Sequence, residues 1–125
     1  MDRLIVAAGA LLGGSAVTLG AFGAHALEGA FTPEQAGWWE MAVHYQMWHA
    51  LGLLFVGALP LARMRLPAWC LGLGAAIFSG TLYLMALGLP RWLGAVTPLG
   101  GALMIAGWMI LAWSALRRRD PDSRR

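Results

Sequence analysis

Four long apolar stretches, separated by short connections, constrain this 125-residue chain more than any other feature. A helix needs about 20 mostly apolar residues to cross the hydrocarbon core of a bilayer, and each stretch is that long. We place the four spans at about residues 4–24, 38–59, 67–89 and 97–116. Together they use most of the chain and leave no room for a separate soluble domain.

Composition agrees with a membrane environment. The chain is 59% hydrophobic and only 12% charged, and its mean hydropathy is +0.64. A chain of this kind has too little polar surface to cover a water-soluble domain of its size. The sequence therefore predicts an all-α polytopic membrane protein, folded as a compact bundle of four transmembrane helices.

Prolines indicate where helices start and stop, because proline lacks a backbone donor and does not fit a helix interior. Pro60 and Pro67 bracket the second connection. Thr97 and Pro98 are typical of the N-cap and first residue of a helix, which places the start of the last span there. The alternative is a helix that begins near Arg91 and kinks at Pro98.

The arginines predict the orientation. All nine basic residues are arginine, and only Arg91 falls on one side of the four-span arrangement. The positive-inside rule then places both termini in the cytoplasm, as expected for a multi-pass protein of the bacterial inner membrane. The remaining eight residues lie together on the cytoplasmic side: Arg3, Arg63, Arg65, Arg117, Arg118, Arg119, Arg124 and Arg125.

The calculated isoelectric point, near 10.0, does not indicate nucleic-acid binding. The arginines are distributed as topology determinants and as a short basic tail at residues 117–125. We interpret the tail as a charge that stops translocation and attracts anionic lipid headgroups. The lipid bilayer is thus the expected partner, and nucleic acid is not.

Five polar residues interrupt the second span: Glu40, His44, Tyr45, Gln46 and His49. Such side chains are costly in hydrocarbon unless they are paired. At 100° per residue Glu40 and His44 share a helix face, whereas His44 and His49 diverge by about 140°. The two histidines are therefore poorly placed to bind one ion, and the zinc motif H-E-x-x-H is absent. We expect no metal, no cofactor and no catalytic residues here.

Two interpretations of this polar run remain open. In the first, the side chains hold the helices together, and His49 hydrogen-bonds Ser79, Thr81, Tyr83 or a backbone carbonyl near mid-membrane. In the second, they form a ligand site or a proton path, since histidine changes charge near neutral pH. A metal or haem site would need His25 or a second subunit to complete it.

His25 ends the first span, and the connection to the second span is short. The outer ends of these two helices should therefore meet. We expect His25 to approach His44, Tyr45 or Thr97, because a buried polar side chain needs a partner. Any pocket is expected at this meeting point, with Glu40 making it accessible to water.

Small residues recur at four-residue spacing on single helix faces. Gly and Ala at such positions let neighbouring backbones approach closely in a membrane. We expect close helix packing at Gly9, Gly13, Gly20, Ala76 and Gly80.

Several longer motifs resemble a known family. They are LGAFGAHAL at residues 19–27, YQMWHAL at 45–51, FSGTLY at 78–83, and TPLGG at 97–101 followed by Gly107-Trp108. In these motifs the chain resembles the uncharacterised bacterial membrane proteins of domain-of-unknown-function family four-two-three, to which a transmembrane protein of animal mitochondria is related. The resemblance implies a four-helix membrane protein without an established activity, and it supplies no catalytic residues.

Two classes of function follow from the sequence. The first is an accessory, scaffold or assembly component of a larger membrane complex, or a homo-oligomer. The alternative is a small carrier or binding protein for a proton, metal, haem, quinone or lipid that uses the His/Tyr/Gln cluster. An enzyme is not expected, because no nucleophile with an adjacent base, phosphate loop or Cys/His metal spacing is present.

Overall fold

The computed structural model of the chain describes residues 1–60 and 63–117, and the described part contains helices but no strand. The all-α class is therefore confirmed. The expected basic tail lies outside the described residues, apart from Arg117. The helices are α1 (Arg3–His25), α2 (Pro33–Ala58), α3 (Arg65–Ala86), the 3₁₀ helix η1 (Arg91–Ala95) and α4 (Thr97–Leu116).

The first two helices begin at side-chain caps. The Asp2 carboxylate accepts hydrogen bonds from the backbone N–H groups of Leu4 and Ile5. At α2, Thr32 and Gln35 form a reciprocal capping box, with proline at the first helical position. This start lies five residues before the predicted span, because capping residues are polar and an apolar pattern does not include them.

Thr97 was predicted to cap α4, and this prediction is wrong. Val96 occupies the N-cap position, and Thr97 is the first residue inside the helix. The η1 turn leads directly into α4, which partly agrees with the alternative of a helix starting near Arg91. The Thr97 hydroxyl bonds back to the Leu93 carbonyl oxygen at 3.2 Å, as hydroxyls inside helices commonly do, so it is not available for capping.

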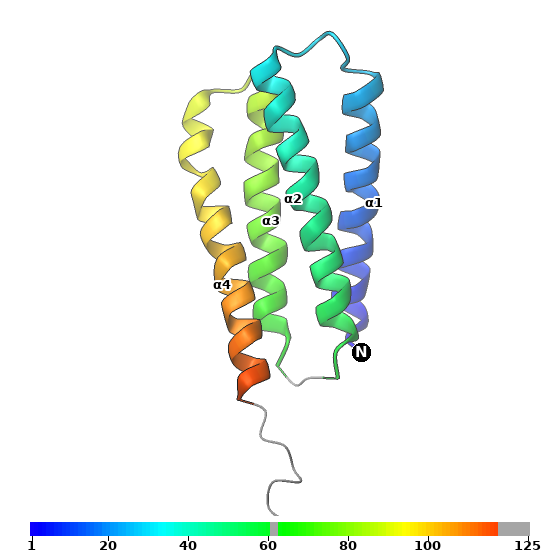
Figure 1. Cartoon of the computed structure of the whole chain (residues 1–125), viewed down its shortest axis with the longest axis vertical. Helices are drawn as coiled ribbons and strands as arrows, with labels where there is room; N and C mark the ends of the chain where they lie inside the picture. The colour runs from blue at the N-terminus through cyan, green and yellow to red at the C-terminus, as the bar shows by residue number, and fades with distance from the viewer. Residues whose placement is uncertain (61–62, 118–125) are drawn as a thin grey trace, which may run out of the picture.

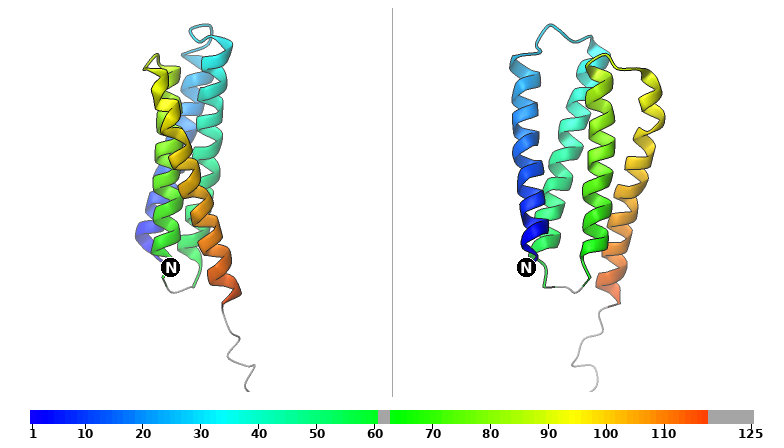
Figure 2. Two further views of the ribbon diagram at one scale, coloured as in Figure 1. Left: turned by 90° about the vertical axis from the view of Figure 1, so that its left-hand side faces the viewer. Right: turned by 180° about the vertical axis from the view of Figure 1, so that it is seen from behind.

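The four long helices form an open row in the order α1, α2, α3, α4, each antiparallel to the next (Figure 1). The view from behind shows the same order (Figure 2, right). Within the described residues, the backbones of α1 and α4 do not come close to each other. The row is thus less closed than the compact bundle that the sequence predicted, because close packing joins only consecutive helices along most of their length.

One end of the row carries the N-terminus and the C-terminal end of α4 (Figure 1). We call it the arginine end, because Arg3, Arg65 and Arg117 lie at these helix termini. Here α1 also reaches α3, through a core cluster that contains Ile5, Leu53 and Leu71. The opposite end carries the connections from α1 to α2 and from α3 to α4.

Glycines set the distance between α1 and α2. A Cβ added at Gly9 would lie 2.9 Å from the Ala50 carbonyl oxygen, and one at Gly20 would lie 3.2 Å from the Val43 side chain. Gly13 also faces Ala50. The three glycines of α1 that were expected at a helix-packing face therefore do lie on such a face, and this face packs against α2 within the same chain.

Ala76 and Gly80 do not pack against another helix as expected. Ala76 is exposed, and a Cβ added at Gly80 would meet nothing within 4 Å. The contact between α3 and α4 instead depends on Gly74 and Gly100, where an added Cβ would come within 2.8 Å of backbone atoms of the facing helix. The four-residue pattern identifies small residues but not which face a neighbour covers.

Three segments of the described chain are long and apolar enough to cross a membrane: Arg3–His25, Arg65–Ala86 and Arg91–Leu116. The remaining long helix, α2, has 26 residues and is not among them. Its length suffices for a span, but it carries Glu34, Glu40 and the histidines, which lower its hydropathy.

Candidate functional site

The polar residues of α2 divide between two faces of the helix. Gln46 and His49 are buried, each with 5% of its surface exposed. Glu40 and His44 are exposed. Tyr45 lies between the two faces, half-buried, and packs its ring against Phe78 of α3 at 4.5 Å. The predicted polar run is therefore two groups with different surroundings.

Gln46 joins three helices through one amide. Its Nε2 donates to the Leu12 carbonyl oxygen at 3.0 Å and to Ser15 Oγ at 2.8 Å, both on α1. Its Oε1 accepts a hydrogen bond of 2.7 Å from the Tyr83 hydroxyl on α3. A buried amide requires such partners, and here both ends of the amide are paired.

His49 joins α2 to α4, although these helices are not neighbours in the row. Its Nε2 accepts a hydrogen bond of 3.1 Å from the indole N–H of Trp108. Since an indole only donates, Nε2 carries no proton, and Nδ1–H donates to the Tyr45 carbonyl oxygen at 2.8 Å. This arrangement requires a neutral imidazole. A backbone carbonyl was one of the expected partners of His49. The other three, Ser79, Thr81 and Tyr83, bond other groups, and nothing in the sequence indicated Trp108.

Two hydroxyl contacts complete the internal set. Ser79 Oγ of α3 donates to the Ala42 carbonyl oxygen of α2 at 2.7 Å. Thr81 Oγ1 of α3 and Thr97 Oγ1 of α4 are 2.6 Å apart and share a hydrogen bond. Thr97 thus belongs to the α3–α4 interface and not to a pocket beside His25.

Trp39 joins α1 to α2 in the half of the row away from the arginine end, a role that the sequence did not indicate. Its indole N–H donates to the Leu19 carbonyl oxygen at 2.9 Å, and its ring meets Tyr83 edge-on with centroids 4.6 Å apart. Gly23 provides the space for the indole, since a Cβ there would overlap the ring. The glycine-rich motif around residue 23 was the available signal.

The predicted contact of His25 with His44, Tyr45 or Thr97 is wrong. His25 is exposed, and its side chain makes no hydrogen bond within the described residues. His25 lies five residues after Gly20, so it is turned about 140° from the glycine face that packs on α2. A short connection brings helix ends together but does not aim a particular side chain inward.

The internal polar set links helices, and its buried polar atoms are paired with one another or with backbone groups. In the described part of the chain, no buried side-chain nitrogen or oxygen lacks a hydrogen-bond partner. The same residues contain no group of three or more His, Cys, Asp or Glu that could hold a metal ion. Gln46, His49, Ser79 and Thr81 therefore act as interhelical ties, which is what polar groups most often do inside membranes.

The fold and these ties define a class: a helical membrane protein whose few buried polar groups bond its helices to one another. The chain belongs to the family described as "Protein of unknown function (DUF423)", whose model matches residues 19–101. The matched segment includes every residue that takes part in the ties described above, except Leu12, Ser15 and Trp108.

Its relatives are named membrane proteins. The UPF0382 membrane protein SH2409 of Staphylococcus haemolyticus is 44% identical, over 92% of this chain and 97% of the relative. YwdK of Bacillus subtilis is 36% identical, over 92% and 98%. The inner membrane protein YgdD of Escherichia coli is 36% identical, over 93% and 92%. No solved structure matches the chain. Together with the three apolar helices, these relatives identify a multi-pass protein of the bacterial inner membrane.

Proposed function

We propose that this protein is a non-catalytic accessory component that docks onto another membrane protein through the uncovered face of α2. This docking face consists of Glu40, His44, Trp48, Leu51 and Phe55, all of which are exposed. The observation that carries the proposal is the exposure of an acid and a histidine on a helix inside an apolar protein.

The proposal includes a four-span topology with both termini in the cytoplasm. In the row, α2 lies between and antiparallel to α1 and α3, so it has to cross wherever they cross. Its 26 residues extend about 39 Å at 1.5 Å per residue, which exceeds the roughly 30 Å hydrocarbon core. Described arginines gather at the arginine end, and Arg91 at the opposite end is paired with Glu34 at 2.8 Å. The positive-inside rule favours this orientation.

The depth of His44 supports a protein partner. Its neighbour Val43 packs on Gly20, which lies five residues, or about 8 Å, before the end of α1. His44 is therefore below the level of the helix end. Ionisable side chains at such depth almost always face protein or a water-filled cavity rather than lipid.

Two aromatic rings of the docking face stack on each other and remain exposed. The His44 and Trp48 rings lie nearly parallel, with centroids 5.8 Å apart, and Trp48 is 54% exposed. Large aromatic residues are enriched in protein interfaces. The carrier alternative loses support, because the two buried members of its His/Tyr/Gln cluster, His49 and Gln46, already bond groups on other helices.

Site-specific photo-crosslinking in native membranes tests the proposal. A photoreactive residue replaces Trp48, and the matched control carries it at Met109, which is exposed on α4. We expect a discrete protein adduct from position 48 and none from position 109. The substitution His44→Leu, placed in the position-48 background, should abolish that adduct.

The adduct's mass distinguishes the possible partners. An adduct larger than two copies of the chain supports a different membrane protein as the partner. An adduct of twice the chain mass would mean that the partner is a second copy of this chain, in a homo-oligomer, and not a different protein. Equal labelling at positions 48 and 109, or labelling that His44→Leu leaves unchanged, would refute docking through α2.

A further inference from the structure

A groove runs along the side of the row where α1 and α3 flank α2. Its volume is about 420 Å³, and Leu53 of α2 lies on its floor. Small residues keep it open, with Ala8 on the α1 side and Gly72 and Ala76 on the α3 side. Ala76 is one of the two α3 positions where the expected helix packing is missing. The groove exists because the row is open.

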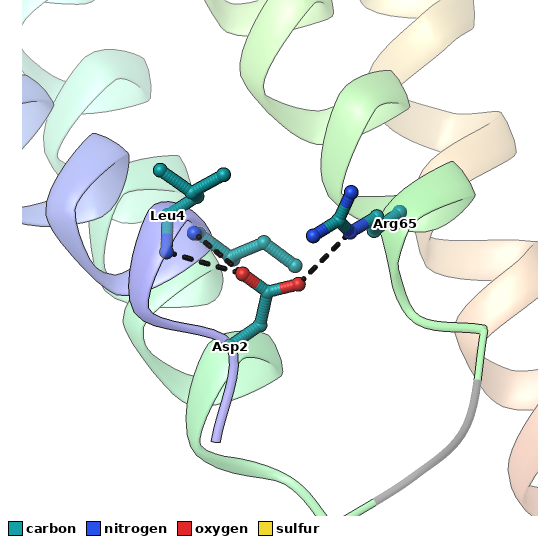
Figure 3. Close-up of polar contacts among 4 residues, drawn as sticks. Asp2, Leu4 and Arg65 are labelled. Carbon is teal, nitrogen blue, oxygen red and sulfur yellow. Dashed lines mark hydrogen bonds and ion pairs between the residues drawn. The ribbon is translucent and has the colours of Figure 1, made fainter.

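The groove ends at a charged contact at the arginine end. There Arg65 Nε donates to Asp2 Oδ2 at 3.1 Å, while Asp2 Oδ1 caps the first turn of α1 (Figure 3). Asp2 therefore holds the guanidinium through one nitrogen. The Arg65 side chain is 70% exposed, so its remaining N–H groups are accessible to an anion.

A second hollow of about 720 Å³ adjoins this contact and shares Asp2 and Arg65 with the groove. Arg3 and Arg63 also line it. Neither of these two arginines makes an ion pair with any described residue. Three guanidinium groups thus face one carboxylate, and the hollow has a positive excess that an anionic headgroup would complement.

The groove's length selects an occupant. From Arg65 to Ala76 is eleven residues of helix, or about 16 Å. That distance is about half of the roughly 30 Å hydrocarbon core, which is the depth of one leaflet. A transmembrane partner helix would need the whole thickness, whereas an acyl chain extends through one leaflet with its headgroup at the surface. Trp69 lines the groove near this end and is 70% exposed, and tryptophan is enriched at the membrane interface.

We propose that this groove binds one acyl chain of an anionic phospholipid, whose phosphate is held by Arg65 together with Arg63 and Arg3. The cytoplasmic leaflet follows from the topology proposed above, but the pairing of groove and arginines does not depend on docking through α2. The site lies on the opposite side of α2 from His44, since Leu53 is turned about 180° from it around the helix.

Native mass spectrometry of the full chain in mild detergent tests this site, with synthetic phosphatidylglycerol and phosphatidylcholine of identical acyl chains as probes. We expect tighter retention of phosphatidylglycerol. Arg65→Gln should weaken it about fivefold, the effect of one basic residue near an anionic headgroup. Arg91→Gln is the matched control at the opposite end and should change nothing.

A second pair of variants tests the acyl chain. Ala76→Phe fills the groove and should reduce retention of both lipids severalfold. Ala10→Phe, at an exposed position on the outer face of α1, should leave both unchanged. Equal retention of the two lipids, or displacement of phosphatidylglycerol by glycerol phosphate alone, would overturn the proposal. So would a dimer that Ala76→Phe dissociates, because a second copy would then occupy the groove.

His44→Leu separates this inference from the proposed function. The variant should keep phosphatidylglycerol bound while losing the Trp48 adduct. Loss of lipid selectivity in Arg65→Gln with the adduct intact supports the lipid site whatever the fate of the docking proposal.

Discussion

The two faces of α2 carry similar side chains in different surroundings. On the covered face, the Gln46 amide and the His49 ring each bond groups on other helices, and both residues are buried. On the uncovered face, His44 stacks only on Trp48 of its own helix, and Glu40 is exposed. The difference teaches that polar residues in one apolar helix can serve two purposes. One set closes the fold, and the other remains available to a partner.

The same contrast between covered and uncovered faces occurs on α1, where it predicts the largest effect. Gly9→Leu would push side-chain atoms into the α2 backbone, since even a Cβ lies 2.9 Å from the Ala50 carbonyl oxygen. We expect a loss of roughly 3 kcal/mol of unfolding free energy, as for overpacked cores. Gly14→Leu, where a Cβ meets nothing within 4 Å, is the control. Reversible denaturation in mixed detergent micelles measures both, and equal losses would contradict the assignment of the two faces.

On α2, Gln46→Leu should cost more than any substitution at Glu40. It removes three interhelical hydrogen bonds, and each such bond is worth about 0.6 kcal/mol in a membrane, so the expected loss is roughly 2 kcal/mol. Glu40→Leu should stay within about 0.5 kcal/mol, as exposed substitutions usually do. Thermal unfolding of the two variants in one detergent makes the comparison. A larger loss for Glu40→Leu would reverse the roles given to the faces.

A double-mutant cycle sharpens the assignment of His49. His49→Ala and Trp108→Phe each break the 3.1 Å bond between α2 and α4, so the double variant should lose less than the sum of the single losses. We expect a coupling of about 0.6 kcal/mol, and at most about 1.7 kcal/mol. His49→Gln retains hydrogen-bonding capacity and should lose less than His49→Ala. Strict additivity of the single losses would show that the two rings are not bonded.

The sequence predicted the helices better than their faces. Span length, prolines and composition are properties of one segment, and they predicted the all-α class and helices near the observed bounds. The side of each helix that meets a neighbour depends on the other helices. For that reason His25 was expected inside and lies outside, and Ala76 was expected at a helix contact and lines a groove.

Partners of buried polar groups were predictable only by type. Polar groups in hydrocarbon need hydrogen-bond partners, which led to the expectation that His49 bonds a hydroxyl of α3 or a backbone carbonyl, and of these only the carbonyl is a partner. Trp108 is 59 residues away along the chain, and nothing local to it indicates that its indole reaches past α3 to His49 of α2. Thr97 was misplaced for a related reason, because the η1 turn before it removed the need for a side-chain cap.

The smallest expected effect concerns Asp2 and Arg65, a polar contact exposed to water at the arginine end. The hydrogen bond from the Arg65 guanidinium, more than the backbone N–H groups at the helix start, holds the pKa of the Asp2 carboxyl below its usual value near 3.8. A lowered pKa means that the contact stabilises the fold at pH values above the usual pKa and loses that contribution as the pH falls through the lowered one. The α1–α3 end should therefore be insensitive to pH between about 5 and 7 and loosen only below about pH 4.

A carbon-13 NMR titration of the Asp2 carboxyl measures its pKa. The titration midpoint should rise toward the usual value in Arg65→Gln but change little in Arg91→Gln. Because the contact is exposed, screening by solvent keeps its contribution small compared with the buried ties of α2. An unchanged midpoint in Arg65→Gln would mean that the guanidinium does not stabilise the carboxylate, and the arginine would then be free of Asp2 altogether.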